Sequence, residues 1–188
     1  MDDEEIYQHL QLLSLHGQSK DALSKNRLGA WEYDIIGPWY KCNMTDLMAA
    51  LGLAQLERYQ DLLARRRAII QRYDAAFKPL GVKVLPHFTK EHQSTGHLYI
   101  TRIPGIHDDQ RREIITRMAE NGIACNVHYK PLPMMTAYKN LGFDIVDYPN
   151  AYRLYENEIT LPLHTLLSDE DVEHVIASYS ALVKQYAR

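Results

Sequence analysis

The stretch GHLYITRIPGIHDDQRREIITRMAENGIACNVHY, residues 96–129, decides the fold class because its apolar repeat changes twice. In HLYITRIP the apolar residues Leu98 and Ile100 occupy alternate positions, as in a strand with one buried face. DDQRREIITRMAENG then has an acidic first turn and Gly122 as a stop, which predicts a helix. IACNVHY returns to alternation. Strand, helix and strand in succession indicate an α/β domain.

The second of these strands would carry different side chains on its two faces. One face is apolar, with Ile123, Cys125 and Val127. The other face is polar, with Asn126, His128 and Lys130 near the strand end. His128 is therefore a candidate functional residue, although a structural histidine held by its neighbours explains the pattern equally well.

The segments around this core extend the same architecture. Upstream, VKVLP is a further short strand, and the helical patterns before it begin at a cap on Thr45 or Asp46 and stop at Pro79 and Gly81. Downstream come two proline-initiated helices, PLPMMTAYKNLG and YPNAYRLYENE, and the brief strand ITLPLH. The closing helix, SDEDVEHVIASYSALVKQY, has Ser168 as its cap. This order predicts a small, largely antiparallel sheet with helices on one face.

The first part of the chain is less regular. Residues 2–15 predict a short amphipathic helix that stops at Gly17. Residues 18–42 show no periodicity but contain several aromatic side chains, Trp31 and Tyr33 among them. A long loop of this kind inside a compact domain is usually functional.

Composition narrows the class of protein. The chain has 188 residues and a formal charge of −3, so it has no electrostatic basis for binding nucleic acid. Cys42 and Cys125 lie far apart and outside any C-x-x-C motif, which favours a reducing compartment. There is no apolar run of membrane-spanning length, and the acidic start MDDEE is unlike a signal peptide. We expect a cytoplasmic protein without membrane contacts.

Generic catalytic and metal-binding motifs do not explain the sequence. The nucleophile elbow, the phosphate-binding glycine loop and the dinucleotide fingerprint do not occur. His87, His92 and His97 recur every five residues, which suits neither one helix face nor one strand face, so we expect a polar hairpin there and no metal site. The basic run ARRRA predicts a solvated helix face rather than a nucleic-acid surface.

Seven segments in order resemble one family. They are LLSLHG, YKCNMTDLMAALGLAQLERY, RRRAIIQRYDAAF, GHLYITRI, NGIACNVHYKPLPMMTAY, YPNAYRLYENEITLPLH and LSDEDVEHVI. From about Ile6 to the end, the chain resembles the C-terminal half of the DegT/DnrJ/StrS sugar aminotransferases. The resemblance implies the small C-terminal domain of a fold-type-I aminotransferase, preceded by long helices. It implies a remnant of the large domain over residues 1–42, interdomain or dimer helices over 43–80, and the α/β domain over 81–188.

The resemblance also implies a reaction. Family members use pyridoxal 5'-phosphate (PLP) to move an amino group, commonly from glutamate, to a keto group on a nucleotide-linked sugar. Their Schiff-base lysine lies in a serine-rich segment upstream of the matched region, and none of the nine lysines here has that context. We therefore expect a C-terminal fragment with no catalytic residue of its own, inactive and without bound PLP when isolated.

Individual residues carry expected roles from the family. The loop before the MTD motif reaches the partner subunit's PLP phosphate, which makes Lys41 and Asn43 cofactor-binding candidates. Many relatives carry the amide and the cation in the reverse order. HY in NVHYKPL makes His128 and Tyr129 substrate-binding candidates, and Trp31 and Tyr33 would lie at the active-site mouth, where stacking on a sugar or base and packing within the loop are equally compatible with them.

Two alternatives remain open at this level. A sugar dehydratase of the same family would carry a histidine in place of the upstream lysine. A non-catalytic domain would dimerise or serve a full-length paralogue. We expect exposed apolar surface on the first helices, because a half-subunit lacks the domain against which they pack, and therefore a homodimer or a tendency to aggregate.

Overall fold

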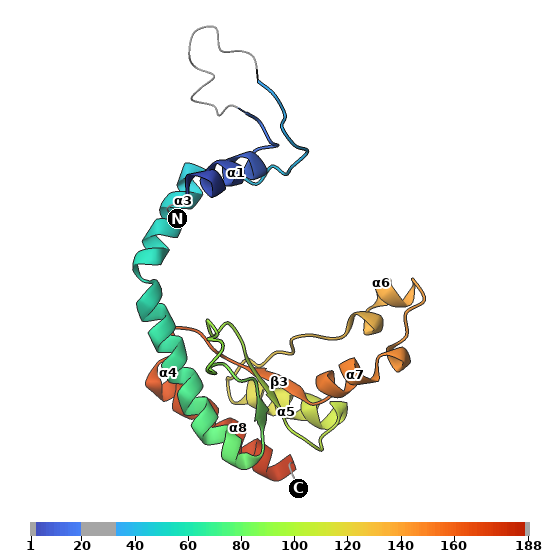
Figure 1. Cartoon of the computed structure of the whole chain (residues 1–188). Coiled ribbons are helices and arrows are strands. Elements are labelled where there is room, and N and C mark those ends of the chain that lie inside the picture. The colour runs from blue at the N-terminus through green and yellow to red at the C-terminus, as the bar shows by residue number, and fades with distance from the viewer. Residues whose placement is uncertain (1–2, 20–32, 187–188) are drawn as a thin grey trace. The chain divides into compact units, whose positions relative to one another are not determined.

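The computed structural model describes residues 3–19 and 33–186 and divides the chain into two compact units, Met1–Glu57 and Arg58–Arg188. Figure 1 traces the chain from α1 (blue) to α8 (red). Expected helices on either side of residue 58 thus fall into different units. The three-way division of the sequence stays a prediction.

The first unit contains α1 (Glu4–Ser14) and α3 (Asp46–Glu57). Asp3 caps α1, because its Oδ1 accepts a hydrogen bond from the Ile6 amide at 3.0 Å. Gly17 follows with a φ of +70°, and a Cβ at this position would collide with the backbone of Gly37. Only glycine therefore suits this turn.

Thr45 caps α3, with its Oγ1 3.4 Å from the Met48 amide, so the predicted start of this helix is confirmed. No residue of α1 or α3 is buried within the described part of the chain. Leu47, Leu51 and Leu56 of α3 are 74%, 64% and 65% exposed. The expected exposed apolar surface on the first helices is therefore present.

The second unit holds the sheet and the remaining helices. In chain order its elements are α4 (Tyr59–Phe77), η1 (Lys78–Leu80), β1 (Lys83–Val84), β2 (Tyr99–Arg102), α5 (Asp108–Glu120), η2 (Leu132–Met134), α6 (Thr136–Lys139), η3 (Ile145–Asp147), α7 (Pro149–Tyr155), β3 (Glu158–Leu161) and α8 (Asp169–Tyr186). The sheet has the order β1-β2-β3, and both pairs are antiparallel. The predicted α/β domain with a small antiparallel sheet is confirmed.

The buried face of β2 is the opposite of the one that the sequence indicated. Tyr99, Thr101 and Ile103 are fully buried, whereas Leu98 and Ile100 are only half-buried. Tyr99 and Thr101 can be buried because each hydroxyl has a hydrogen-bond partner. Tyr99 donates to Asp74 Oδ1 at 2.8 Å, and Thr101 Oγ1 donates to the Ile159 carbonyl at 2.6 Å.

Three long helices supply the rest of the core. α4 buries Ile69, Ile70, Tyr73 and Phe77, and α5 and α8 add further apolar side chains. α8 starts at a reciprocal cap, in which the Asp171 amide donates to Ser168 Oγ at 3.0 Å and the Ser168 amide donates to Asp171 Oδ2 at 2.9 Å. The predicted cap at Ser168 is confirmed.

Of the three histidines expected in a hairpin, His87 and His92 lie in one, whereas His97 follows it in the segment that leads into β2. Phe88 pairs with Gln93, and the Ser94 amide donates to the His87 carbonyl at 2.7 Å. His87 stacks on the Tyr99 ring, while His92 lies on the exposed turn. Separately, none of the helices in the described part of the chain is both long enough and apolar enough to span a membrane.

Candidate functional site

The segment after α5 places His128 beside β3. Asn126 pairs with Thr160 of β3 through two backbone hydrogen bonds of 3.1 and 2.8 Å. Beyond Asn126 this segment forms no further backbone pairing with β3. The Val127 amide instead donates a hydrogen bond to Asn126 Oδ1 at 2.8 Å. The predicted strand IACNVHY is therefore wrong as a strand and is a single bridge, although Ile123 is buried as expected.

Three residues form a buried polar network under this bridge. Thr160 Oγ1 donates to Glu158 Oε1 at 2.6 Å, and the His128 amide donates to Glu158 Oε2 at 3.0 Å. His128 Nδ1 lies 2.9 Å from Thr160 Oγ1. Glu158 is 4% exposed and Thr160 5%. Burial raises the pKa of the Glu158 carboxyl, and the bonds from Thr160 and His128 oppose the shift.

This network selects one tautomer of His128. When Glu158 is ionised its oxygens can only accept, so the single proton of the Thr160 hydroxyl goes to Glu158. Thr160 Oγ1 can then only accept from His128, so Nδ1 carries the ring proton. In the neutral ring, Nε2 is left as an acceptor, with no hydrogen-bond partner in the described ranges.

His128 and Tyr129 share one pocket of about 260 Å³. Its lining residues are His128, Tyr129, Pro131, Ala151, Leu154, Tyr155 and Glu158. The Tyr129 ring is 71% exposed and meets the His128 ring edge-on, with the centroids 4.6 Å apart. The pocket thus combines apolar walls with one oriented imidazole, a combination that suits a small polar molecule with an apolar face.

Glu158 and Thr160 are the residues of this site that the sequence interpretation missed. They alternate on β3, and all four of its residues are buried. A glutamate and a threonine two residues apart in a buried strand need hydrogen-bond partners, and this need is the sequence feature that could have identified them as site residues. Their pairing with His128 depends on the bridge to Asn126, which local periodicity does not predict.

Lys41 and Asn43 lie together in an extended segment of the first unit. The backbone is fixed to the end of α1: Lys41 bridges Leu15, and the Cys42 amide donates to the Ser14 carbonyl at 2.9 Å. Lys41 and Asn43 are exposed, and in the part of the chain that the structure describes their side chains make no hydrogen bond or ion pair. A cation and an amide donor held on a fixed backbone fit a phosphate group.

The aromatic candidates are only partly described. Trp31 lies outside the described residues. Tyr33 is 50% exposed and precedes a pairing of Gln18 with Ile35. The structure therefore brings His128 and Tyr129 together in the second unit, and Lys41 and Asn43 together in the first.

Comparison with known proteins finds relatives along nearly the whole chain. The sequence model of the DegT/DnrJ/EryC1/StrS aminotransferase family matches residues 1–180. The "Spore coat polysaccharide biosynthesis protein SpsC" of Bacillus subtilis is 37% identical over 191 residues, which cover 97% of this chain and 48% of that protein.

Solved structures agree. The PMP-form of "Putative sugar aminotransferase Spr1654" from Streptococcus pneumoniae superimposes with a TM-score of 0.83 and 56% identity, over 99% of this chain and 47% of that one. Its PLP-form gives a TM-score of 0.80 at 53% identity, over 99% and 45%. The chain thus spans about half the length of the relatives that it matches.

Proposed function

Because the chain belongs to the DegT/DnrJ/EryC1/StrS aminotransferase family, we propose that it forms the C-terminal part of a PLP-dependent sugar aminotransferase. The amino group would pass from glutamate to a keto group on a nucleotide-linked sugar. The observation that carries the proposal is the His128 pocket, in which buried Glu158 and Thr160 hold one imidazole in a defined tautomer.

The sugar would bind at this pocket. His128 Nε2 accepts a hydrogen bond from a sugar hydroxyl, because the network already holds the ring proton on Nδ1. The exposed Tyr129 ring offers a flat apolar surface on which the carbon face of a sugar stacks. Leu154 and Ala151 exclude water from the same space.

Lys41 and Asn43 would hold the cofactor phosphate of the partner subunit in a homodimer. Lys41 supplies the charge and Asn43 an amide donor. The pairing of Lys41 with Leu15, directly after α1, fixes the backbone from which the two side chains extend. Bound PLP supplies the electron sink for amino transfer. Trp31 and Tyr33 would line the mouth of the site.

The names of the relatives support a context for this activity. SpsC is described as a polysaccharide biosynthesis protein, and we propose a cell-surface polysaccharide as the destination of the amino sugar. The compartment would be the cytoplasm. The exposed apolar residues of α3 would pack against the rest of the enzyme and its dimer partner.

A chimera tests the proposal. The N-terminal half of Spr1654 joined to residues 1–188 replaces a segment that is 56% identical, so the joined protein should fold. We expect it to bind PLP, seen as an absorbance band that glutamate changes. Lys41→Ala should then weaken PLP binding, and His128→Ala should raise KM for the nucleotide sugar. A folded chimera that takes up no PLP would contradict the proposal.

The isolated chain provides the matched control. We expect it to fold and to show no PLP absorbance after the cofactor is added. A band that borohydride removes while labelling a lysine would overturn the view that this chain lacks the anchoring lysine. The codons ahead of Met1 distinguish the dehydratase alternative, since they would encode a histidine where an aminotransferase has lysine.

A further inference from the structure

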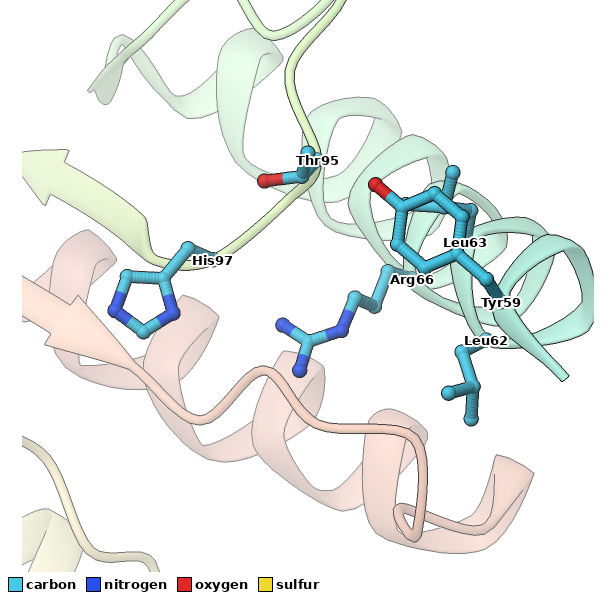
Figure 2. A pocket seen from close by; sticks show the side chains of 6 residues that line it. All are labelled: Tyr59, Leu62, Leu63, Arg66, Thr95 and His97. Carbon is cyan, nitrogen blue, oxygen red and sulfur yellow. The ribbon is translucent and has the colours of Figure 1, made fainter. Parts of the chain in front are cut away.

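A separate pocket of about 340 Å³ opens beside the first turns of α4, and Figure 2 shows it from close by. Its lining residues are Tyr59, Leu62, Leu63, Arg66, Thr95 and His97. The first four come from α4, and the other two flank Gly96 in the segment that leads into β2. In Figure 2, Arg66 extends from α4 toward the segment that carries Thr95 and His97, and the His97 ring points away from the guanidinium.

Gly96 fixes the position of Arg66. It has a φ of +67°, and a Cβ there would lie 2.9 Å from Ile70 Cδ1 and 3.3 Å from Arg66 Cβ. Glycine thus lets the chain lie close against α4. The Gly96 carbonyl then accepts a hydrogen bond from Arg66 Nη1 at 2.7 Å, which holds the guanidinium at the pocket.

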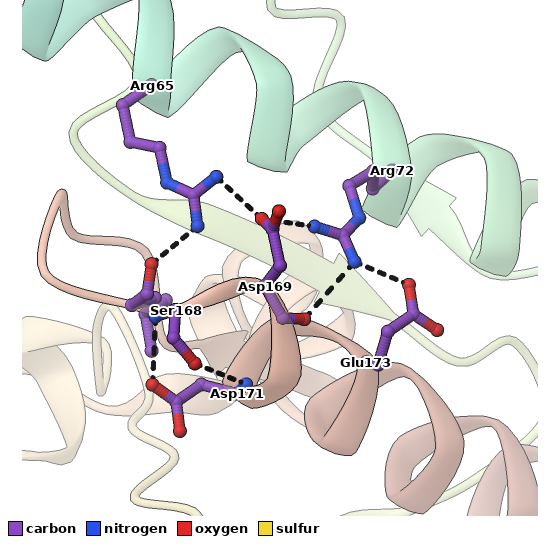
Figure 3. A network of polar contacts seen from close by, with 7 residues as sticks. Arg65, Arg72, Ser168, Asp169, Asp171 and Glu173 are labelled. Carbon is purple, nitrogen blue, oxygen red and sulfur yellow. Dashed lines mark hydrogen bonds and ion pairs between the residues drawn. The ribbon is translucent and has the colours of Figure 1, made fainter.

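Two of the four arginines of α4, Arg66 and Arg67, have no carboxylate partner among the described residues. Arg65 and Arg72 both pair with Asp169, at 2.8 and 2.7 Å, and Arg72 also pairs with Glu173, as Figure 3 shows. Arg67 donates to Gln93 and lies over the Phe88 ring. Among the described residues, Arg66 donates to a neutral carbonyl, and its charge has no carboxylate to balance it.

The remaining polar groups of the pocket share this lack of partners. The lining contains neither aspartate nor glutamate. Over the described residues, the side chains of His97, Thr95 and Tyr59 form no hydrogen bond. Hydrogen-bond donors therefore surround an unbalanced positive charge, while Leu62 and Leu63 form an apolar wall beside it. This finding also corrects the expectation that ARRRA is a solvated face, since Arg65, Arg66 and Arg67 are all half-buried.

We propose that this pocket binds the carboxylate of a small aliphatic acid. The planar fork of Arg66 matches a carboxylate, with His97, Thr95 and Tyr59 as further donors. The leucine wall receives the carbon chain. The volume lies at the lower end of the roughly 300–1,000 Å³ typical of ligand pockets, so the acid is short. The proposal does not depend on the proposed function.

Ligand titration followed by NMR tests this proposal on the 188-residue chain. The probes are butyrate, its uncharged isostere butyramide, and inorganic phosphate. The reporters are the Thr95 methyl group and the His97 ring protons. We expect butyrate to shift both saturably and more tightly than phosphate, and butyramide to have no effect.

Two matched variants assign the binding. Arg66→Gln should weaken butyrate binding about tenfold or more, because a charged hydrogen bond is lost. Arg67→Gln, one residue away and outside the pocket, should leave the affinity unchanged. If Arg66→Gln does not fold, His97→Ala replaces it and should also weaken binding. Equal shifts with butyramide, tighter binding of phosphate, or equal losses in the two arginine variants would each overturn the proposal.

Discussion

Two successive helices, α3 and α4, both carry several large apolar side chains but have opposite environments in the structure. α4 buries Ile69, Ile70, Tyr73 and Phe77 completely, whereas α3 leaves its leucines largely exposed. The unit 58–188 therefore has its own core, and the described part of the unit 1–57 has no buried apolar side chain. An apolar helix face predicts that the face is buried, but it does not identify the chain that buries it.

The distribution of apolar residues on α3 supports this distinction. Met48, Leu51 and Leu53 point in different directions around the helix, and each is at least 58% exposed. A helix that is apolar all round is normally buried on every side. The difference between the two units can thus be tested by chemistry and by mutation.

The largest expected difference between the two units is in the alkylation rate of their cysteines, since each unit contains one. Cys42 is exposed, and Cys125 is half-buried beside the core. Burial raises the pKa of Cys125 to about 12, and the thiolate is the reactive form. At pH 8 only about one part in ten thousand of such a thiol is ionised, so iodoacetamide should label Cys125 on the order of a thousandfold more slowly than an ordinary exposed thiol.

Single-cysteine variants make this measurement direct. Cys125→Ser reports on Cys42 alone, and Cys42→Ser reports on Cys125, with the adduct followed by mass spectrometry. In urea both thiols should react at similar rates. Similar rates in the native chain would show that the second unit does not protect its interior.

Core substitutions should show the next largest effect. Phe77 is fully buried against Tyr73, Tyr99 and Tyr179, at ring-centroid distances of 5.5, 6.3 and 5.1 Å. Phe77→Ala should lower the free energy of unfolding by about 3–5 kcal/mol, because it removes buried area and leaves a cavity. Urea unfolding followed by circular dichroism measures the change.

Leu51→Ala is the matched control in the other unit. Leu51 is 64% exposed, so its removal should change the free energy of unfolding by less than about 0.5 kcal/mol. A loss comparable to that of Phe77→Ala would show that α3 is covered in the isolated chain, for example by a second copy. Repeating the measurement at several protein concentrations identifies that case.

The sequence predicted local features well and long-range pairing poorly. Thr45 and Ser168 caps and the glycine stop at Gly122 follow from the residues next to them, and all three are present. The inward face of β2 depends on partners for Tyr99 and Thr101 that come from distant segments. Alternation alone therefore selected the wrong face.

The candidate site shows the same limit. His128 was identified from its own polar neighbours and from the family motif. Glu158 and Thr160 orient it, but they reach it across a bridge between segments about thirty residues apart in the chain. Lys41, Asn43, Trp31 and Tyr33 rest on the family resemblance and stay predictions.

The stability of the second unit should also depend on pH, through His87, and we expect this effect to be smaller than that of the core substitution. His87 is 5% exposed and stacks on Tyr99 at 5.7 Å, and neither ring nitrogen has a partner among the described residues. Burial lowers its pKa, Lys78 adds to the shift and Asp74 opposes it. The folded state therefore binds this proton less readily than the unfolded state.

The free energy of unfolding should consequently fall as the pH drops below about 6.5, the ordinary pKa of histidine, and this residue should contribute no dependence above it. His87→Phe preserves the stacking and should flatten the profile in that window. His164→Gln replaces an exposed histidine and should leave the profile unchanged. Urea unfolding at several pH values measures all three proteins. An unchanged profile in His87→Phe would assign the acid sensitivity to another group.

The ion pairs between α4 and α8 should show the smallest effect. Asp169 accepts from Arg65 and Arg72 (Figure 3), but its side chain is 66% exposed. The hydrogen bond and charge of Arg65, joined by Arg72, lower the pKa of Asp169. Its stabilising contribution is therefore present above the ordinary aspartate pKa of about 3.9 and is lost as the pH falls through the lowered value.

Asp169→Asn should lower the urea midpoint slightly at pH 7 and low salt, and high salt should reduce the difference because solvent ions screen exposed pairs. Glu170→Gln removes a neighbouring carboxylate that has no ion-pair partner in the described ranges, so it should have a still smaller effect. A loss in Asp169→Asn as large as that of Phe77→Ala would mean that these surface pairs, rather than the core, hold α4 against α8, and would remove the basis for calling the second unit self-sufficient through its core.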